Sequence, residues 1–161
     1  MTTNSDVVDN SDFVTSLREA IIFANSQTGT DTITFDTSVF NGGEASLIRL
    51  GGTELEVTES LTIDADGATD VVITADRDGN DTRVGGTFIT DVAASLTNDS
   101  TSLDDNSRVL NFSASSGDLT LNNLTVTGGR TTGDFADGGG IFTSSGAVSY
   151  THLTLPTICS V

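Results

Sequence analysis

The side chains of this chain that best match a metal-binding pattern lie in one short segment, DRDGND at residues 76–81, and DADGATD at 64–70 matches it less well. Carboxylate and amide oxygens are the ligands that Ca²⁺ prefers in proteins. The spacing is not that of an EF-hand, because Gly79 stands at the fourth loop position instead of the sixth. An acidic surface turn is the simpler interpretation of the segment. The sequence therefore offers candidate calcium ligands and no other cofactor site: Asp76, Asp78, Asn80 and Asp81.

Catalytic residues are harder to find in this sequence. The best pairing is Arg130 with the nearby Asp134 and Asp137. A polysaccharide lyase or glycosidase needs a carboxylate pair, or calcium-binding aspartates beside a basic residue. However, GDFADGGGIF at 133–142 is typical of a solvated, glycine-rich turn and lacks the Lys and Ser/Thr of a phosphate-binding loop. We therefore expect no enzyme here. Inward- or groove-facing carboxylates and arginines that converge on one strand face would favour a polysaccharide-active enzyme instead, whereas scattered outward carboxylates would favour adhesion or a stalk.

The charge balance restricts the partners of the chain. Its 161 residues carry a formal net charge of −17, and all six basic residues are arginines. Nucleic acids and anionic membranes both require a basic surface, so we expect neither as a partner. No apolar run approaches the roughly 20 residues of a membrane-spanning helix. This composition is typical of a secreted or surface protein, although Met1–Phe13 has no signal-peptide pattern and the true N-terminus is expected to be missing.

The segment SLREAIIFAN predicts a single short α-helix over about residues 16–26. Ser16 can cap its N-terminus while Glu19 reaches back, which is a capping box. A helix of about 11 residues is not stable alone in water, so its apolar stripe must dock on another element. We expect it to cover the open end of a β structure. The residues of this structural cap are Ser16, Leu17, Glu19, Ala20, Ile21 and Ala24.

Downstream of this helix the apolar period changes from helical to alternating, which predicts short strands separated by turn residues. No helical segment follows, so βαβ units are excluded. In LTLNNLTV the alternation breaks at Asn122–Asn123, as expected for a tight corner between two strands. SRVLNF at 107–112 allows two alternations, Val109 with Asn111 or Leu110 with Phe112. Irregular stacked coils with a loop insertion over about residues 85–105 fit this pattern; a β-sandwich is the alternative.

Several of these segments resemble a known family. SLREAIIFAN followed by DTITFD resembles the N-terminal, CSLREA-type region of bacterial surface proteins with right-handed parallel β-helices. SRVLNF, LTLNNLTVTGG and DGGGIF are similar to the coil repeats of polymorphic outer-membrane proteins and autotransporter adhesins. The resemblance covers roughly Val7 to Ser149, with a gap in the middle, and Thr15 occupies a position where the family often has Cys.

This resemblance implies an all-β fold, the N-terminal part of a right-handed parallel β-helix over residues 1–149, with the short helix as its cap. It implies a non-catalytic module of a longer, extracellular or cell-surface bacterial protein, used in adhesion or as a stalk. The ligand would be an unspecified polysaccharide or protein of a host or cell surface. The alternative is a polysaccharide-active β-helix enzyme.

The last residues differ in composition from the rest of the chain. SYTHLTLPTICSV holds the only Tyr, His, Pro and Cys. It resembles a translated sequencing-adapter tail of the kind found in metagenomic reading frames, so residues 150–161 are expected to be non-native. THLTL does alternate, and a genuine strand is the other interpretation. His152 and Cys159 are therefore not taken as a catalytic or metal-binding pair.

Overall fold

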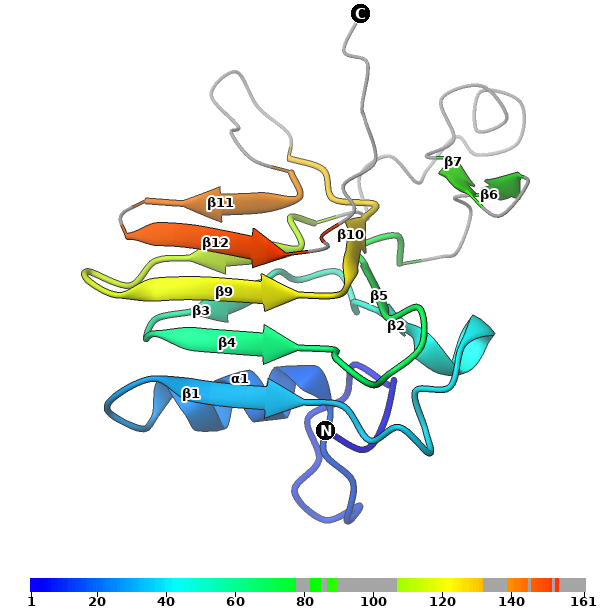
Figure 1. The fold of residues 1–161 in the computed structure, drawn as a ribbon, viewed down its shortest axis with the longest axis horizontal. Helices are drawn as coiled ribbons and strands as arrows, with labels where there is room; N and C mark the ends of the chain where they lie inside the picture. Colours follow the sequence, from blue (N-terminus) through cyan, green and yellow to red (C-terminus); the bar gives the residue numbers. More distant parts are fainter. Residues whose placement is uncertain are drawn as a thin grey trace, which may run out of the picture.

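The computed structural model describes residues 1–77, 82–84, 87–89, 107–131, 139–144, 146–151 and 153 (Figure 1). This part of the chain contains one α-helix, one short 3₁₀ helix and twelve short strands. Their bounds are α1 Leu17–Asn25, β1 Asp31–Thr34, η1 Gly43–Ser46, β2 Leu47–Arg49, β3 Leu55–Val57, β4 Leu61–Asp64, β5 Val72–Thr74, β6 Thr82–Val84, β7 Thr87–Ile89, β8 Leu110–Phe112, β9 Asp118–Asn122, β10 Thr125–Thr127, β11 Ile141–Thr143 and β12 Ala147–Thr151.

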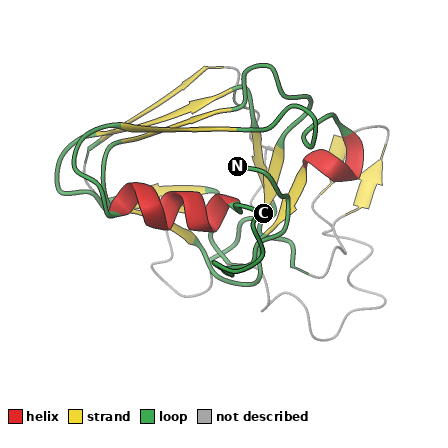
Figure 2. Cartoon of the chain, turned by 90° about the horizontal axis from the view of Figure 1, so that it is seen from below, coloured by secondary structure: helices red, strands yellow, loops and turns green. Residues whose placement is uncertain are grey.

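Ten of these strands form three parallel sheets, in the orders β1-β4-β9-β12, β2-β5-β10 and β3-β8-β11. The chain passes through the three sheets repeatedly and in the same order, and each pass adds one strand to every sheet. We call one such pass a coil. Figure 2, seen from below the stack, shows the sheets around a common interior with α1 across its lower end. The all-β prediction with one short helix is thus confirmed, and parallel pairing does not match the antiparallel sheets of a β-sandwich.

Strand register places like side chains above one another inside the stack. Ile33 pairs with Ile63 and Ile63 with Leu121, while Ile48 pairs with Ile73. All of these side chains are buried, whereas the intervening Thr62 is half-buried. The interior is therefore a column of aliphatic rows built by the alternation that the sequence predicted.

Of the two alternations possible in SRVLNF, the structure has the one in which Leu110 and Phe112 point inward. Leu110 and Phe112 of β8 are fully buried in the core. Asn111 between them is half-buried, and its amide reaches outward to Glu54. Val109, just before the strand, is buried as well.

The corner predicted at Asn122–Asn123 separates β9 from β10. Asn123 has a φ of 54°, the left-handed conformation that Asn tolerates better than most residues. Its backbone N–H donates to the carbonyl of Thr151 at 3.0 Å, and its side-chain amide donates to the carbonyl of Ala65 at 3.4 Å. The corner therefore links three successive coils as well as turning the chain.

The segment predicted as a loop insertion is partly a strand. Thr87–Ile89 forms β7, which pairs antiparallel with β6 at Thr82–Val84; the rest of residues 85–105 lies outside the described part. Gly85–Gly86 between two short β-prone triplets is a hairpin signal that the interpretation as a loop overlooked.

The boundary expected after Ser149 falls inside β12. Tyr150 and Thr151 continue this strand and pair with Leu121 and Asn122 of β9. His152 and residues 154–161, including Cys159, lie outside the described residues.

Two glycines that flank the connection between β10 and β11 lie in backbone contact with each other. A Cβ added to Gly139 would lie 2.6 Å from the carbonyl oxygen of Gly129, and one added to Gly129 would collide with the carbonyl of Gly139. We expect Gly139→Ala to lower the free energy of unfolding by about 1–3 kcal/mol, because backbone atoms cannot move aside as a flexible side chain can. Gly140→Ala is the matched control, since its Cβ would meet only Val126 Cγ1 at 3.9 Å. Urea unfolding of both variants measures the difference, and equal midpoints would contradict the contact.

Candidate functional site: the N-terminal cap

The first strand of each parallel sheet, β1, β2 or β3, lies at the N-terminal edge of its sheet. Such edges carry backbone N–H and C=O groups that lack a strand partner and that can template aggregation. Residues 1–26 lie along these three edges, and we call them the N-terminal cap. Its contacts determine how the stack of coils is closed at this end.

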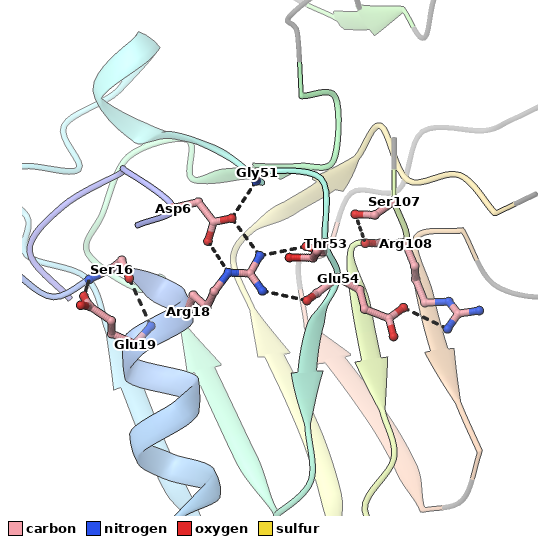
Figure 3. A network of polar contacts seen from close by, with 9 residues as sticks. All are labelled: Asp6, Ser16, Arg18, Glu19, Gly51, Thr53, Glu54, Ser107 and Arg108. Atoms are coloured by element: carbon pink, nitrogen blue, oxygen red, sulfur yellow. Dashed lines mark hydrogen bonds and ion pairs between the residues drawn. The ribbon is translucent and has the colours of Figure 1, made fainter. Parts of the chain in front are cut away.

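The helix of the cap begins as the sequence predicts. Ser16 Oγ accepts a hydrogen bond from the backbone N–H of Glu19 at 3.1 Å, and Glu19 Oε2 accepts from the N–H of Ser16 at 2.8 Å (Figure 3). This is the reciprocal capping box. Leu17, Ile21 and Ala24 are buried against the core, and Ala20 packs partly buried beside them. α1 lies against β1 and β3, which places the helix over two of the three open edges.

Arg18 joins the cap to the chain that enters β3. Its Nε and Nη2 donate to the two carboxylate oxygens of Asp6 at 2.9 and 2.8 Å. Its Nη1 donates to the carbonyl of Glu54, and its Nη2 also donates to that of Thr53, each at 2.8 Å (Figure 3). The planar guanidinium can serve a carboxylate and two carbonyls at once because it carries five donors in a fixed geometry.

Asp6 is the buried partner of this arrangement. Its side chain is 4% exposed, against 18% for Arg18. Asp6 Oδ2 also accepts from the backbone N–H of Gly51 at 2.8 Å. Both carboxylate oxygens therefore have donors, as a desolvated charge requires.

Asn25, at the other end of α1, supplies the edge of β3 with strand-like hydrogen bonds. Its Nδ2 donates to the carbonyl of Glu56 at 2.8 Å, and its Oδ1 accepts from the N–H of Thr58 at 2.9 Å. One side-chain amide thus satisfies an acceptor and a donor that a neighbouring strand would otherwise pair.

The segment before the helix supplies hydrogen bonds to the edges of β1 and β2. Asn4 Nδ2 donates to the carbonyl of Leu47 in β2 at 3.3 Å. The amino group of Met1 donates to the carbonyl of Thr34 in β1 at 2.6 Å, and the N–H of Asp36 donates to the Met1 carbonyl. All three end strands therefore receive hydrogen bonds from the N-terminal cap.

A second polar group lies on the outer face of the β3–β8–β11 sheet. Glu54 Oε2 is 3.1 Å from Arg108 Nη1, and Glu54 Oε1 accepts from Asn111 Nδ2 at 2.8 Å. The Arg108 guanidinium lies 4.5 Å from the ring centroid of Phe142 in the next coil. Glu56 accepts from the hydroxyl of Ser113 on the same face. Carboxylates and an arginine thus converge on one sheet face, and this face is the outer one, whereas inward- or groove-facing groups are what would favour a polysaccharide-active enzyme.

The structure describes only two of the other candidate site residues, Asp76 and Arg130. Asp76 is buried, and its Oδ2 is 3.2 Å from Arg49 Nη1. Asp78, Asn80 and Asp81 lie outside the described residues, as do Asp134 and Asp137, the expected partners of Arg130. The described residues contain no group of three or more His, Cys, Asp or Glu side chains placed to hold a metal ion.

Sequence reasoning identified the helix, its capping box and its buried face. It missed the roles of Asn4, Asp6 and Asn25. Their partners lie far along the chain: Asp6 is 12 residues from Arg18, and the partners in the first coil are 31 to 45 residues away. No local pattern marks these residues, because hydrogen bonds to the edges of distant strands leave no periodicity in the sequence.

The capping box also gives the cap a pH dependence. Hydrogen bonds from the backbone N–H groups of Ser16 and Asp9 to the carboxylate lower the pKa of Glu19 below its ordinary value of about 4.5. Ionised Glu19 therefore stabilises the folded state above this ordinary value, and the contribution is lost as the pH falls through the lowered pKa. We expect the free energy of unfolding to fall more steeply with acidification in the wild type than in Glu19→Gln. Urea titrations near pH 7 and at about pH 3 test this, and parallel pH profiles would contradict it.

No helix in the described part of the chain is long and apolar enough to cross a membrane. Comparisons with protein-family models, with curated proteins and with solved structures each gave no match.

Proposed function

We propose that this chain is the N-terminal, capped part of a right-handed parallel β-helix that serves as a non-catalytic module of a secreted or cell-surface bacterial protein. The observation that carries the proposal is the closure of three sheets, visited in rotation, by one N-terminal cap. The right hand follows from the strong preference of connections between parallel strands of one sheet. The resemblance to CSLREA-type regions supports the same proposal.

The stacked coils suit a mechanical role in adhesion or as a stalk. Backbone hydrogen bonds between parallel strands hold each coil to the next in all three sheets, and rows of aliphatic side chains pack inside the stack. Such a stack extends by adding coils, and loops between strands can vary without disturbing it. The net charge of −17 favours an extracellular setting in which the module does not associate with nucleic acid. We retain calcium as a proposed ligand of the segment from Asp76 to Asp81, and a polysaccharide or protein of another surface as the proposed partner.

A polysaccharide-active enzyme is the second candidate. The structural feature nearest to its requirements is the convergence of Glu54, Glu56 and Arg108, which lies on the outer face of one sheet. We rank it second because both oxygens of Glu54 already accept hydrogen bonds and Arg108 is stacked on Phe142. A general acid or nucleophile must instead be accessible to the glycosidic bond.

One experiment separates these candidates. Beads coated with the purified chain are incubated with a panel of extracellular polysaccharides and matrix proteins, and both retention and soluble products are measured. Retention without product supports adhesion, and neither retention nor product supports a stalk. Release of oligosaccharides that is lost in Glu54→Gln would overturn the proposal in favour of an enzyme.

A further inference from the structure

The exposed large apolar side chains of the described residues are concentrated in the N-terminal cap. Six of the seven lie between residues 7 and 23, and Tyr150 is the seventh. Phe13 is fully exposed, and Ile22 and Phe23 are 53% and 66% exposed. We call this set the apolar cap surface: Val7, Val8, Phe13, Val14, Ile22 and Phe23.

The outer face of α1 forms one part of this surface. Ile22 and Phe23 lie three and four residues after Glu19, so these three residues share one side of the helix. Leu17 and Ile21 face the core from the opposite side. The exposed pair is therefore separate from the residues that close the stack of coils.

The segment before α1 forms the other part and is held beside the start of this helix face. The backbone N–H of Asp9 donates to Glu19 Oε1 at 2.7 Å, and Asp12 Oδ1 accepts from the N–H of Val14 at 3.0 Å. Phe13 has a φ of 61°, which is strained for a residue with a bulky side chain. The fold gains no burial from this ring in return.

Negative charge surrounds the apolar cap surface. Asp9, Asp12 and Glu19 are the acidic residues of this stretch, and its single cation, Arg18, is paired with Asp6. No basic residue occupies the last turn of α1, where the helix dipole adds further negative potential. Because the chain carries a net charge of −17, a second copy would be repelled from this surface.

We propose that the apolar cap surface docks a basic amphipathic helix of a partner protein. The apolar stripe of that helix would pack against Phe13, Ile22 and Phe23, and its Lys or Arg side chains would face Asp9 and Asp12. An exposed apolar face with a charged rim is the usual arrangement for binding an amphipathic helix of opposite charge. This role goes beyond closure of the coils, which depends on the inward face of α1.

The test uses a fluorescently labelled Leu/Lys peptide of about 18 residues with its leucines at helical spacing. We expect the wild-type chain to bind it, and the triple variant Phe13→Ser, Ile22→Ser, Phe23→Ser to bind at least about tenfold more weakly. Tyr150→Ser is the matched control, because it removes an exposed aromatic side chain far from the cap, and its Kd should change less than about twofold. Unfolding midpoints of all variants verify that they remain folded.

The charge argument is tested separately. Asp9→Asn with Asp12→Asn should weaken binding of the Leu/Lys peptide and flatten its dependence on salt. A Leu/Glu peptide of the same pattern should not bind. Equal binding of a Leu/Lys peptide shuffled to remove the apolar stripe, or an unchanged Kd in the triple variant, would overturn the proposal. Sedimentation showing a dimer that the triple variant loses would assign the surface to a second copy and would also overturn it.

Discussion

Ile21→Asp is expected to lower the free energy of unfolding by roughly 3–5 kcal/mol and to cause aggregation. Ile21 is 2% exposed and packs against the core beside Leu17. The substitution removes a large apolar side chain and places a charge in the same apolar surroundings. Undocking α1 would then expose the edges of β1 and β3. Urea unfolding measures the loss of stability, and size-exclusion chromatography measures the aggregation.

The adjacent residue provides the matched control. Ile22 belongs to the same helix and is 53% exposed, so Ile22→Asp should change the free energy of unfolding by less than about 0.5 kcal/mol. Leu17→Asp should behave like Ile21→Asp, because Leu17 is fully buried. Unchanged stability and solubility of both buried variants would show that the stack of coils does not depend on the helix.

Arg18→Met is expected to destabilise the protein by about 3–5 kcal/mol, because it leaves the buried carboxylate of Asp6 without its counter-charge. It also removes the donors to the carbonyls of Thr53 and Glu54 at the edge that leads into β3. The apolar stem is retained in this variant, so the loss reports mainly on the guanidinium. Urea unfolding at neutral pH measures the change.

A double-mutant cycle isolates the Asp6–Arg18 pair. Asp6→Asn keeps a neutral acceptor for the N–H of Gly51 and removes the buried charge. The double variant should therefore be less destabilised than the sum of the single variants, by at least about 1 kcal/mol. Arg18→Lys should recover only part of the loss, since an ammonium group cannot reproduce the bidentate contact with Asp6. Additive effects of the two single variants would contradict the coupling.

Both predictions concern the same physical problem. A stack of parallel coils has open strand edges at its ends, and natural proteins cover such edges to prevent edge-to-edge association. In this chain the inward face of α1 supplies apolar contact, while Arg18 and Asn25 supply donors to the carbonyls of the first coil. Stability and protection from aggregation are therefore expected to be lost together.

Much of the local structure could be predicted from the sequence. The capping box at Ser16 and Glu19 depends on residues three positions apart, and the buried stripe depends on helical spacing. The corner at Asn123 depends on a break in alternation and on a residue that tolerates positive φ. Each of these signals is local, because the physical cause acts within a few residues.

The candidate site was predictable only in part for the same reason. Arg18 stands in the recognised helix, yet nothing near it indicates that Asp6 is its partner or that the carbonyls of Thr53 and Glu54 lie within reach. The convergence of Glu54 and Arg108 likewise requires that β3 and β8 be neighbours. Glu54 and Arg108 meet because one coil stacks on the next, and the coils differ in length, so no fixed spacing in the sequence indicates the contact.

The sequence by itself thus determined the single α-helix, many of the strands with their inward side chains, and the corner between β9 and β10. Alternation, helical period and turn chemistry each depend on neighbouring residues. Only the tertiary structure decided that the strands pair in parallel in three sheets and that β6 and β7 form a separate hairpin. It also decided that residues 1–15 join the helix in closing the first coil. Parallel partners such as Ile63 and Leu121 are separated by a whole coil and its insertions. Which strands pair depends on the total apolar surface that all the rows of side chains bury inside the stack. No single segment of the sequence contains that information.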